Sequence, residues 1–239
     1  MILRKGYHTS VEDFNKDGRL TSLAVLKIFE NIGNRHSDKA GDSPFNFDGH
    51  TFAWVITEWK IEVTEYPHYT DTIEAETWSE GLTSPLVASR NFLLYKNGEI
   101  CARGTSRWVR IDLQKGRLCK IEKELIDKYE PDTKVAFEDS KVEKIPVPEA
   151  YISEKKIAIR RSDFDFNNHV HNLCYLDYAF EALPDEVYKS QDFKKIRITY
   201  KTAVTESDEI VGKYADVDGK KIVSICTESG EIRALVQFS

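Results

Sequence analysis

The chain contains the segment DFNKDG at residues 13–18 and a similar segment, DFNNHV, at residues 165–170. Three of the six positions are identical, and each segment lies just before a stretch with the apolar spacing of a helix. Three identities are weak evidence by themselves, but the shared position before a helix favours an internal duplication. The sequence therefore predicts two structural repeats within the 239 residues.

The first repeat begins with a helix at residues 20–38, which Thr21 or Ser22 can cap. Its apolar residues follow the period of one helix face and include Val25, Leu26, Phe29 and Ile32. Alternating apolar and polar residues then predict strands at 55–63, 71–78, 86–95 and 99–111. Asn97-Gly98 is a strong signal for a tight turn between the last two strands.

The second repeat follows the same order. A strand is expected at 154–161 and a helix at 172–183, which Pro184 ends. Further strands are expected at 192–203, 208–217, 220–227 and 231–238, with Asp218-Gly219 and Ser229-Gly230 as turns. Between the repeats, residues 122–150 combine prolines with many charges, and a short helix is expected there at 122–129.

A long helix packed on an antiparallel sheet is the pattern of the hotdog fold. We therefore predict an α+β tandem (double) hotdog. The N-terminal hotdog would span residues 1–121, a linker residues 122–150, and the C-terminal hotdog residues 151–239.

Composition limits the class of protein. Hydrophobic residues make up 41% of the chain, which is enough for a sizeable core. Lys plus Arg is 34 and Asp plus Glu is 40, and this net charge of −6 argues against a general nucleic-acid binder. No apolar run approaches the roughly 18 residues of a membrane span. The four cysteines form no CxxC pair, which argues against a zinc ribbon or a thioredoxin-like motif. We expect a cytoplasmic protein, because no signal-peptide pattern is visible and four scattered cysteines suit reduced thiols better than a disulfide framework.

The segment RSDFDFNNHVHN at residues 161–172 brings together carboxylate, amide and imidazole side chains that can take part in catalysis. If it is extended, Asp165, Asn167 and His169 point to the same side. His169 can transfer protons near neutral pH, and Asp165 can activate water or attack directly. Asn167 can donate to a developing oxyanion. Together these groups suit the hydrolysis of an activated acyl group.

Two other interpretations of this segment remain open. Asp and Asn residues often only shape turns and cap helices. A partial metal site is also conceivable from His169 and His171 with Asp163 or Asp165. Because no other ligand cluster is visible, we predict no metal and no cofactor.

The pattern Asp165-x-Asn167-x-His169-Val170-x-Asn172-x-x-Tyr175 resembles the active-site segment of the acyl-acyl-carrier-protein (acyl-ACP) thioesterases. Landmarks of the first half resemble this family in the same order, among them LTSL at 20–23, WVIT at 54–57 and SRWV at 106–109. The resemblance implies a double hotdog that hydrolyses the thioester between a fatty acyl chain and the phosphopantetheine arm of acyl carrier protein. It also implies that Asp165, Asn167 and His169 are catalytic.

The chain departs from the family pattern in two places. His171 stands where the family often has Asn, and Ala203 and Val204 stand where Glu and Cys are expected. A local gap would bring Glu206 to the place of the Glu. The departures keep two alternatives open, which are an acyl-CoA thioesterase on the same fold and an acyl-chain binder without activity.

Comparison of the two repeats predicts different roles for the two halves of the chain. Aligned on the shared DFN, the position that matches His169 is Asp17, so we expect one active site per chain, in the second half. The first half would supply an acyl pocket lined by Val25, Leu26, Phe29 and Ile32.

The expected partner, acyl carrier protein, is acidic, so docking needs a local basic surface. The first candidate group consists of Arg160, Arg161, Lys194, Lys195, Arg197 and Lys201. A second consists of Arg107, Arg110, Lys115, Arg117 and Lys120. Either a monomer or a homodimer is compatible with two hotdogs in one chain.

Overall fold

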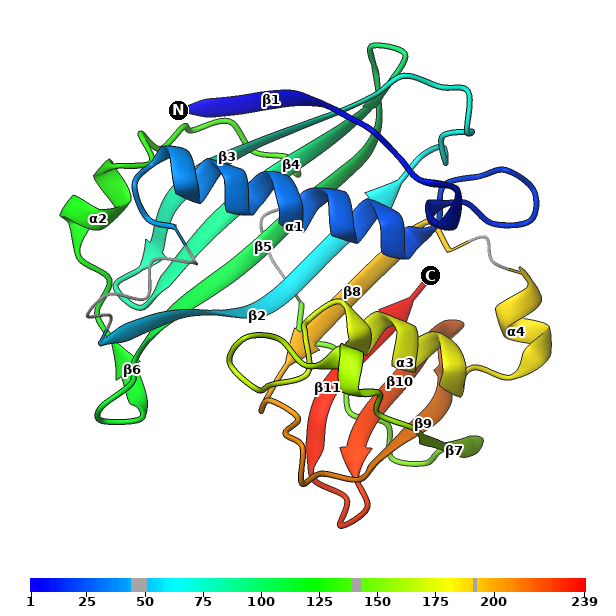
Figure 1. Cartoon of the computed structure of the whole chain (residues 1–239). Helices are drawn as coiled ribbons and strands as arrows, with labels where there is room; N and C mark the ends of the chain where they lie inside the picture. The colour runs from blue at the N-terminus through cyan, green and yellow to red at the C-terminus, as the bar shows by residue number, and fades with distance from the viewer. Residues whose placement is uncertain (44–50, 139–142, 191–192) are drawn as a thin grey trace. The chain divides into compact units, whose positions relative to one another are not determined.

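The computed structural model describes residues 1–43, 51–138, 143–190 and 193–239 (Figure 1). The chain divides into two compact units. Unit 1 comprises residues 1–57 and 61–141, and unit 2 comprises residues 58–60 and 142–239. Each unit is described by itself below.

Unit 1 is built around the helix α1 (Ser22–Lys39), which confirms the predicted helix. The side chain of Thr21 accepts a hydrogen bond from the backbone N–H of Ala24 at 3.1 Å and so caps the first turn. The predicted apolar face is buried, and Val25 and Phe29 have no exposed surface. α1 packs on strands of the unit 1 sheet, which it crosses in Figure 1.

The sheet of unit 1 has the strand order β1-β3-β4-β5-β2, and a short strand β6 pairs with β5. Its strands are β1 (Ile2–Tyr7), β2 (Phe52–Val63), β3 (Ile73–Ser84), β4 (Val87–Lys96), β5 (Glu99–Asp112) and β6 (Arg117–Cys119). The four predicted strands are confirmed, whereas β1 and β6 were not predicted. The alternation in the sequence places Val55 on the same face as Trp59, Ile61 and Val63. This phase is wrong at the start of β2, because Val55 is exposed and Ile56 is buried.

Unit 2 repeats the plan with a shorter helix, α3 (Cys174–Ala182), which packs on an antiparallel sheet. The strand order is β8-β11-β10-β9-β7. The strands are β7 (Ser153–Ile157), β8 (Lys195–Tyr200), β9 (Ile210–Val217), β10 (Lys220–Thr227) and β11 (Ile232–Phe238). β7 is shorter than predicted because the chain turns into a 3₁₀ helix, η2 (Arg161–Asp163).

Two short α-helices and a 3₁₀ helix of unit 1, η1 (Val11–Asp13), are the remaining helices of the described residues. The segment 122–150 contains α2 (Lys123–Asp127), where a short helix was expected. α4 (Asp185–Ser190) follows α3 directly and was not predicted.

Two hairpin turns confirm the predictions made from Asn97-Gly98 and Asp218-Gly219. Asn97 and Gly98 have φ angles of 51° and 90°, and Asp218 and Gly219 have 52° and 78°. Positive φ at both central residues is what a two-residue hairpin turn of type I′ requires.

Neither a disulfide nor a membrane-spanning helix is found in the described parts of the chain. None of the four cysteines, all of which are described, forms a disulfide. Among the described residues, no helix is both long enough and apolar enough to cross a membrane.

Replacing Gly212 by Ala is expected to lower the free energy of unfolding by about 1–3 kcal/mol, the usual cost of overpacking a core. A Cβ at Gly212, on β9, would lie 2.5 Å from the Cβ of Ala182 at the end of α3, so the helix or the strand must shift. The double variant with Ala182→Gly removes this clash and is expected to recover most of the loss. Urea unfolding measures the effect.

The matched control is Gly6→Ala on β1, where an added Cβ meets nothing within 4 Å. This variant is expected to unfold at nearly the wild-type urea concentration. An equal loss in both variants would show that strand glycines matter here for another reason than the close approach of α3.

Candidate active site

The segment that carries Asp165, Asn167 and His169 is a tight turn between η2 and α3. The backbone N–H of Asp165 donates to the carbonyl of His169 at 2.8 Å, and that of Asn168 donates to the carbonyl of Asp165 at 3.0 Å. Asn168 has the left-handed φ of 57°, which an Asn side chain tolerates better than most. The assumption of an extended loop is therefore wrong, and the alternation of sides does not apply to these residues.

The carboxylate of Asp165 holds this turn. Its Oδ1 accepts hydrogen bonds from the backbone N–H groups of Asn167, at 2.8 Å, and His169, at 3.2 Å. Its Oδ2 accepts no hydrogen bond from the residues that the structure describes. Asp165 is half-buried, while Asn167 and His169 are exposed. Asp165 thus shapes the turn with one oxygen and leaves the other available.

Unit 1 contains the same turn with different side chains. The N–H of Asn15 donates to the carbonyl of Arg19 at 2.8 Å, and Gly18 takes the left-handed conformation with φ of 71°. Oδ1 of Asn15 accepts from the N–H groups of Asp17 and Arg19, both at 3.0 Å. The hydrogen bonds therefore equate Asn15, Asp17 and Arg19 with Asp165, Asn167 and His169.

This correspondence corrects the repeat alignment by two residues. The second segment contains Asp-Phe twice, at 163–164 and at 165–166, and the Asp-Phe of residues 13–14 corresponds to the first copy and not to the second. The counterpart of His169 is Arg19 and not Asp17. The unit 1 turn still lacks an imidazole at this position.

A buried carboxylate anchors the start of the turn in unit 2. Asp163 is 2% exposed. It accepts hydrogen bonds from the backbone N–H of Arg160 at 2.8 Å, from Nε of Arg160 at 2.8 Å and from the hydroxyl of Tyr178 at 2.7 Å. The bond to Asp163 raises the pKa of Arg160, and burial together with Asp163 raises the pKa of Tyr178. The turn is thereby tied to α3.

A second loop, residues 203–208, lies beside the turn. The carbonyl of Val204 accepts from the N–H of Val170 at 2.9 Å, and His169 pairs with Thr205 in an isolated antiparallel bridge. The N–H of Val204 in turn donates to the hydroxyl of Tyr175 at 2.8 Å. Ala203, the position where a Glu was expected, is exposed next to this bridge.

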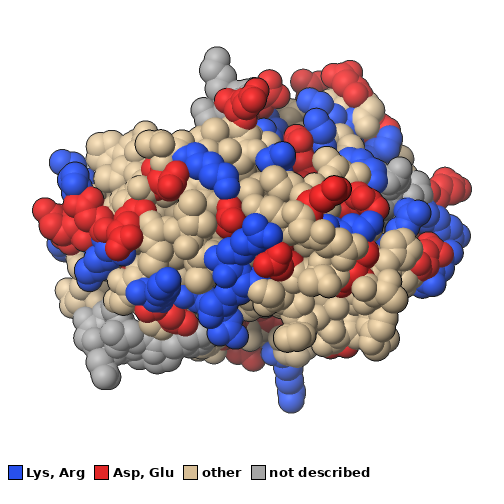
Figure 2. All heavy atoms as spheres, turned by 90° about the horizontal axis from the view of Figure 1, so that it is seen from above, with Lys and Arg blue, Asp and Glu red and all other residues tan. Residues whose placement is uncertain are grey.

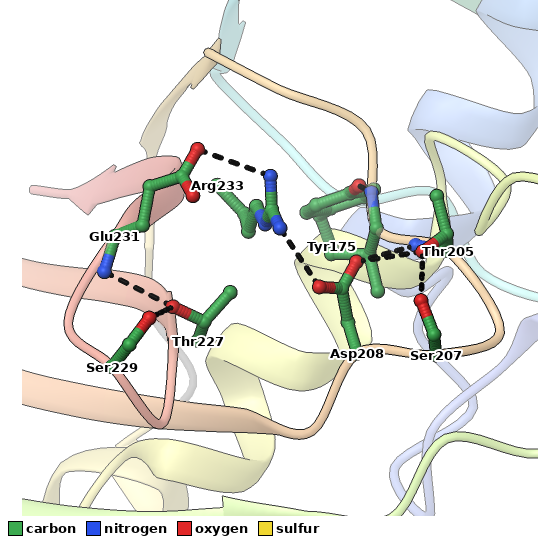
Figure 3. Close-up of polar contacts among 9 residues, drawn as sticks. Tyr175, Thr205, Ser207, Asp208, Thr227, Ser229, Glu231 and Arg233 are labelled. Atoms are coloured by element: carbon green, nitrogen blue, oxygen red, sulfur yellow. Dashed lines mark hydrogen bonds and ion pairs between the residues drawn. The ribbon is translucent and has the colours of Figure 1, made fainter.

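The polar residues that fix the second loop were not predicted. Oδ2 of Asp208 accepts from the N–H of Thr205 at 2.8 Å and from its hydroxyl at 3.0 Å. Nη2 of Arg233 donates to Oδ1 of Asp208 at 2.8 Å (Figure 3). A signal was present in the sequence, because Thr205 and Asp208 have the spacing of a capping box, in which a Ser or Thr is followed three residues later by an acidic residue. Arg233 lies on β11, far from this loop in the sequence, so no local pattern predicts its contact with Asp208.

A groove of about 530 Å³ adjoins the turn in unit 2. Arg161 and Phe164, from the start of the turn, line it together with Glu206 and Asp208 of the second loop. Its other lining residues are Lys156, Ile157, Ala158, Ile159, Glu209, Ile210 and Glu228. Apolar side chains beside charged ones suit a ligand with both kinds of surface.

The residues expected to line an acyl pocket are core residues of unit 1. Phe29 stacks on Phe92 with ring centroids 5.1 Å apart. A Cβ at Gly104 would lie 2.7 Å from the ring of Phe29, so the ring rests directly on β5. Val25, Leu26 and Ile32 are equally buried.

The expected docking residues differ in their surroundings. Arg160 is held by Asp163 at 2.8 Å and lies 4.0 Å from Asp177. Arg161 is exposed, Lys195 and Arg197 lie on β8, and Lys194 precedes that strand. On the face shown in Figure 2, basic and acidic side chains are interspersed.

A partial metal site at His169 and His171 with Asp163 or Asp165 is one interpretation of the sequence. Among the described residues, no group of three or more His, Cys, Asp or Glu side chains is arranged to hold a metal ion. Asp163 is engaged by Arg160 and Tyr178 instead.

Two units, each a helix packed on a sheet, make the chain a tandem hotdog protein, as predicted from the sequence. The structure is similar to that of the 12:0-ACP thioesterase from Umbellularia californica, with a TM-score of 0.90, 22% identity and coverage of 100% of this chain and 96% of that one. It is also similar to an acyl-ACP thioesterase from Bacteroides thetaiotaomicron, with a TM-score of 0.87, 20% identity and coverage of 99% and 96%.

Sequence comparisons identify the family. Residues 2–129 match the acyl-ACP thioesterase N-terminal domain, and residues 148–234 match the acyl-ACP thioesterase C-terminal domain. The chain belongs to the acyl-ACP thioesterase family.

Two curated relatives illustrate the similarity. Over 236 residues the chain is 28% identical to oleoyl-acyl carrier protein thioesterase 2, chloroplastic, of Arabidopsis thaliana, covering 89% of this chain and 62% of the relative. Over 215 residues it is 30% identical to palmitoyl-acyl carrier protein thioesterase, chloroplastic, of Cuphea hookeriana, covering 84% and 51%. The chain thus spans between 51% and 62% of the length of these two relatives.

Proposed function

We propose that this protein hydrolyses fatty acyl-ACP thioesters, releases the free fatty acid and so ends chain elongation. The observation that carries the proposal is the turn of unit 2, in a chain of this family. There Asp165 keeps one carboxylate oxygen available, beside the exposed Asn167 and His169. We assign catalysis to these three residues and to unit 2 alone, because Arg19 replaces the imidazole in the unit 1 turn.

The chemistry follows from the groups available. Oδ1 of Asp165 is committed to two backbone N–H groups, so Oδ2 is the oxygen that takes a proton from the attacking water. The side-chain amide of Asn167 donates to the carbonyl oxygen as negative charge develops there. His169 delivers a proton to the sulfur when the C–S bond breaks, and the products are the fatty acid and the free thiol of the carrier.

The wild-type protein is expected to release fatty acid from acyl-ACP, with a kcat/KM at least about tenfold above that for the matching acyl-CoA, because only the carrier adds a protein surface to bind. The relatives are named for oleoyl, palmitoyl and dodecanoyl chains, so a panel of these three chain lengths on ACP and on CoA is the direct assay. Free fatty acid is quantified by mass spectrometry.

The same panel distinguishes the alternatives. Faster release from CoA than from ACP would identify an acyl-CoA thioesterase. Tight binding of acyl-ACP without release of fatty acid would identify an acyl-chain binder. Ala203, in place of the expected Glu, is the reason to test this alternative.

The division of the chain and its partner belong to the same proposal. Residues 151–239 would form the catalytic half, and residues 1–121 the half that holds the acyl chain. The rings of Phe29 and Phe92 are stacked in that half. An acyl chain can enter between them only if Phe29 moves away from Phe92, and otherwise it has to bind at another place in the unit. Acyl carrier protein would dock on the basic group that includes Arg161 and Lys195, both of which are exposed.

The proposal also includes a cellular location and an oligomeric state. A cytoplasmic location is supported by the four cysteines, none of which forms a disulfide. Both a monomer and a homodimer agree with two hotdog units in one chain.

A further inference from the structure

We propose that Asp208 is a positioning residue for His169, and that it acts through Thr205; this role rests on the proposed function. His169 does the chemistry in that function, and its backbone is paired with Thr205. Whatever fixes Thr205 therefore fixes one side of the catalytic turn.

The first step is the hold of Asp208 on Thr205. One carboxylate oxygen accepts from both the backbone N–H and the hydroxyl of Thr205, at 2.8 and 3.0 Å. The N–H of Asp208 returns a bond to the carbonyl of Thr205 at 3.1 Å, which closes a short loop. A loop closed by three hydrogen bonds keeps Thr205 in one conformation.

The second step is the hold of Arg233 on Asp208. Nη2 of Arg233 lies 2.8 Å from the other carboxylate oxygen, and the two side chains are only 12% and 14% exposed. Burial alone raises the pKa of Asp208, but the bonds from Thr205 and Arg233 outweigh it and the pKa is lowered. Asp208 is thus a carboxylate anchored to β11, a strand of the sheet (Figure 3).

The loop is also held at its other end. The N–H of Val204 donates to the hydroxyl of Tyr175 on α3, and the carbonyl of Val204 accepts from Val170. The backbone opposite His169 is therefore fixed by a helix on one side and by Asp208 and Arg233 on the other. Displacement of a catalytic group by about 1 Å can cost a factor of about a hundred in rate.

Unit 1 provides the matched control, because the same arrangement occurs there without a catalytic histidine. Arg19 pairs with His68, and the N–H of His68 donates to Oδ2 of Asp71 at 2.7 Å. The other oxygen of Asp71 accepts from the side chain of Asn97 at 2.7 Å. Asp71 therefore corresponds to Asp208 in its loop.

The test compares Asp208→Ala with Asp71→Ala in the full chain, using acyl-ACP hydrolysis and amide hydrogen exchange. In Asp208→Ala, kcat is expected to fall about tenfold to a hundredfold with KM little changed, and exchange to accelerate at residues 164–170 and 203–208. In Asp71→Ala, exchange is expected to accelerate at residues 66–71 while kcat stays near wild type. Asp208→Asn keeps an acceptor for Thr205 and is expected to lie between Asp208→Ala and wild type.

Each other outcome counts against the role. Equal losses of kcat in both Ala variants would indicate general destabilisation, and unchanged exchange at residues 164–170 in Asp208→Ala would break the link to His169. An active wild type whose Asp208→Ala variant keeps its kcat would overturn this inference alone. A wild type that releases no fatty acid from any carrier-linked chain would overturn the proposed function, and this role with it.

Discussion

Replacing Asp165 by Asn is expected to lower the turnover of acyl-ACP by about 10²–10⁴-fold, the usual contribution of a general base, while the fold is kept. The reason to expect an intact turn is Asn15, whose amide oxygen already accepts the same two backbone bonds in unit 1. An Asn at residue 165 can accept these bonds but cannot take a proton from water. Steady-state kinetics measures the loss, and thermal unfolding reports the fold.

The reverse substitution, Asn15→Asp, is the control. It introduces a carboxylate into the unit 1 turn, where Arg19 stands in place of the histidine, and is expected to leave turnover unchanged. If Asp165→Asn kept wild-type turnover, Asp165 would only shape the turn, which is the simpler interpretation of an Asp in such a loop.

The second large effect is expected for His169→Ala, with a loss of turnover of about 10²–10⁴-fold, because no proton donor would then serve the leaving sulfur. The imidazole is exposed and the turn is held by the backbone of His169, so the fold does not depend on this side chain. A single-turnover assay with carrier-linked substrate measures the effect on the chemical step.

The matched variant is Arg19→Ala, since Arg19 and not Asp17 occupies the equivalent position in unit 1. It is expected to retain turnover. Similar losses in the two variants, with both proteins folded, would argue against a single active site in unit 2.

Much of the fold was predictable because helix and strand periods are local properties. The apolar period of α1 predicted its buried face, and Asn97-Gly98 predicted a turn whose two φ angles are positive. β1 was missed because Leu3 is its only buried residue, so no alternation is visible. The start of β2 was assigned the wrong phase, since an exposed Val55 and a buried Ile56 are equally apolar in the sequence.

The site was predictable in its residues but not in its shape. The spacing of Asp165, Asn167 and His169 can be recognised within one short segment. The left-handed backbone of Asn168, which turns this segment back on itself, cannot be recognised from the spacing. Thr205 pairs with His169 of the turn, and Arg233 holds Asp208 of the second loop, and only the folded chain brings these residues together. Likewise, two overlapping Asp-Phe pairs made the repeat register ambiguous until hydrogen bonds decided it.

The duplicated turn separates architecture from reactivity. Two copies with the same backbone hydrogen bonds carry Asn15, Asp17 and Arg19 in one unit and Asp165, Asn167 and His169 in the other. In both turns the Oδ1 atom of the first of these residues, Asn15 or Asp165, accepts the same two backbone hydrogen bonds. The same backbone turn is therefore compatible with two different sets of side chains. In unit 1, the substitutions Asn15→Asp, Asp17→Asn and Arg19→His would place the three side chains of the proposed active site on the equivalent turn.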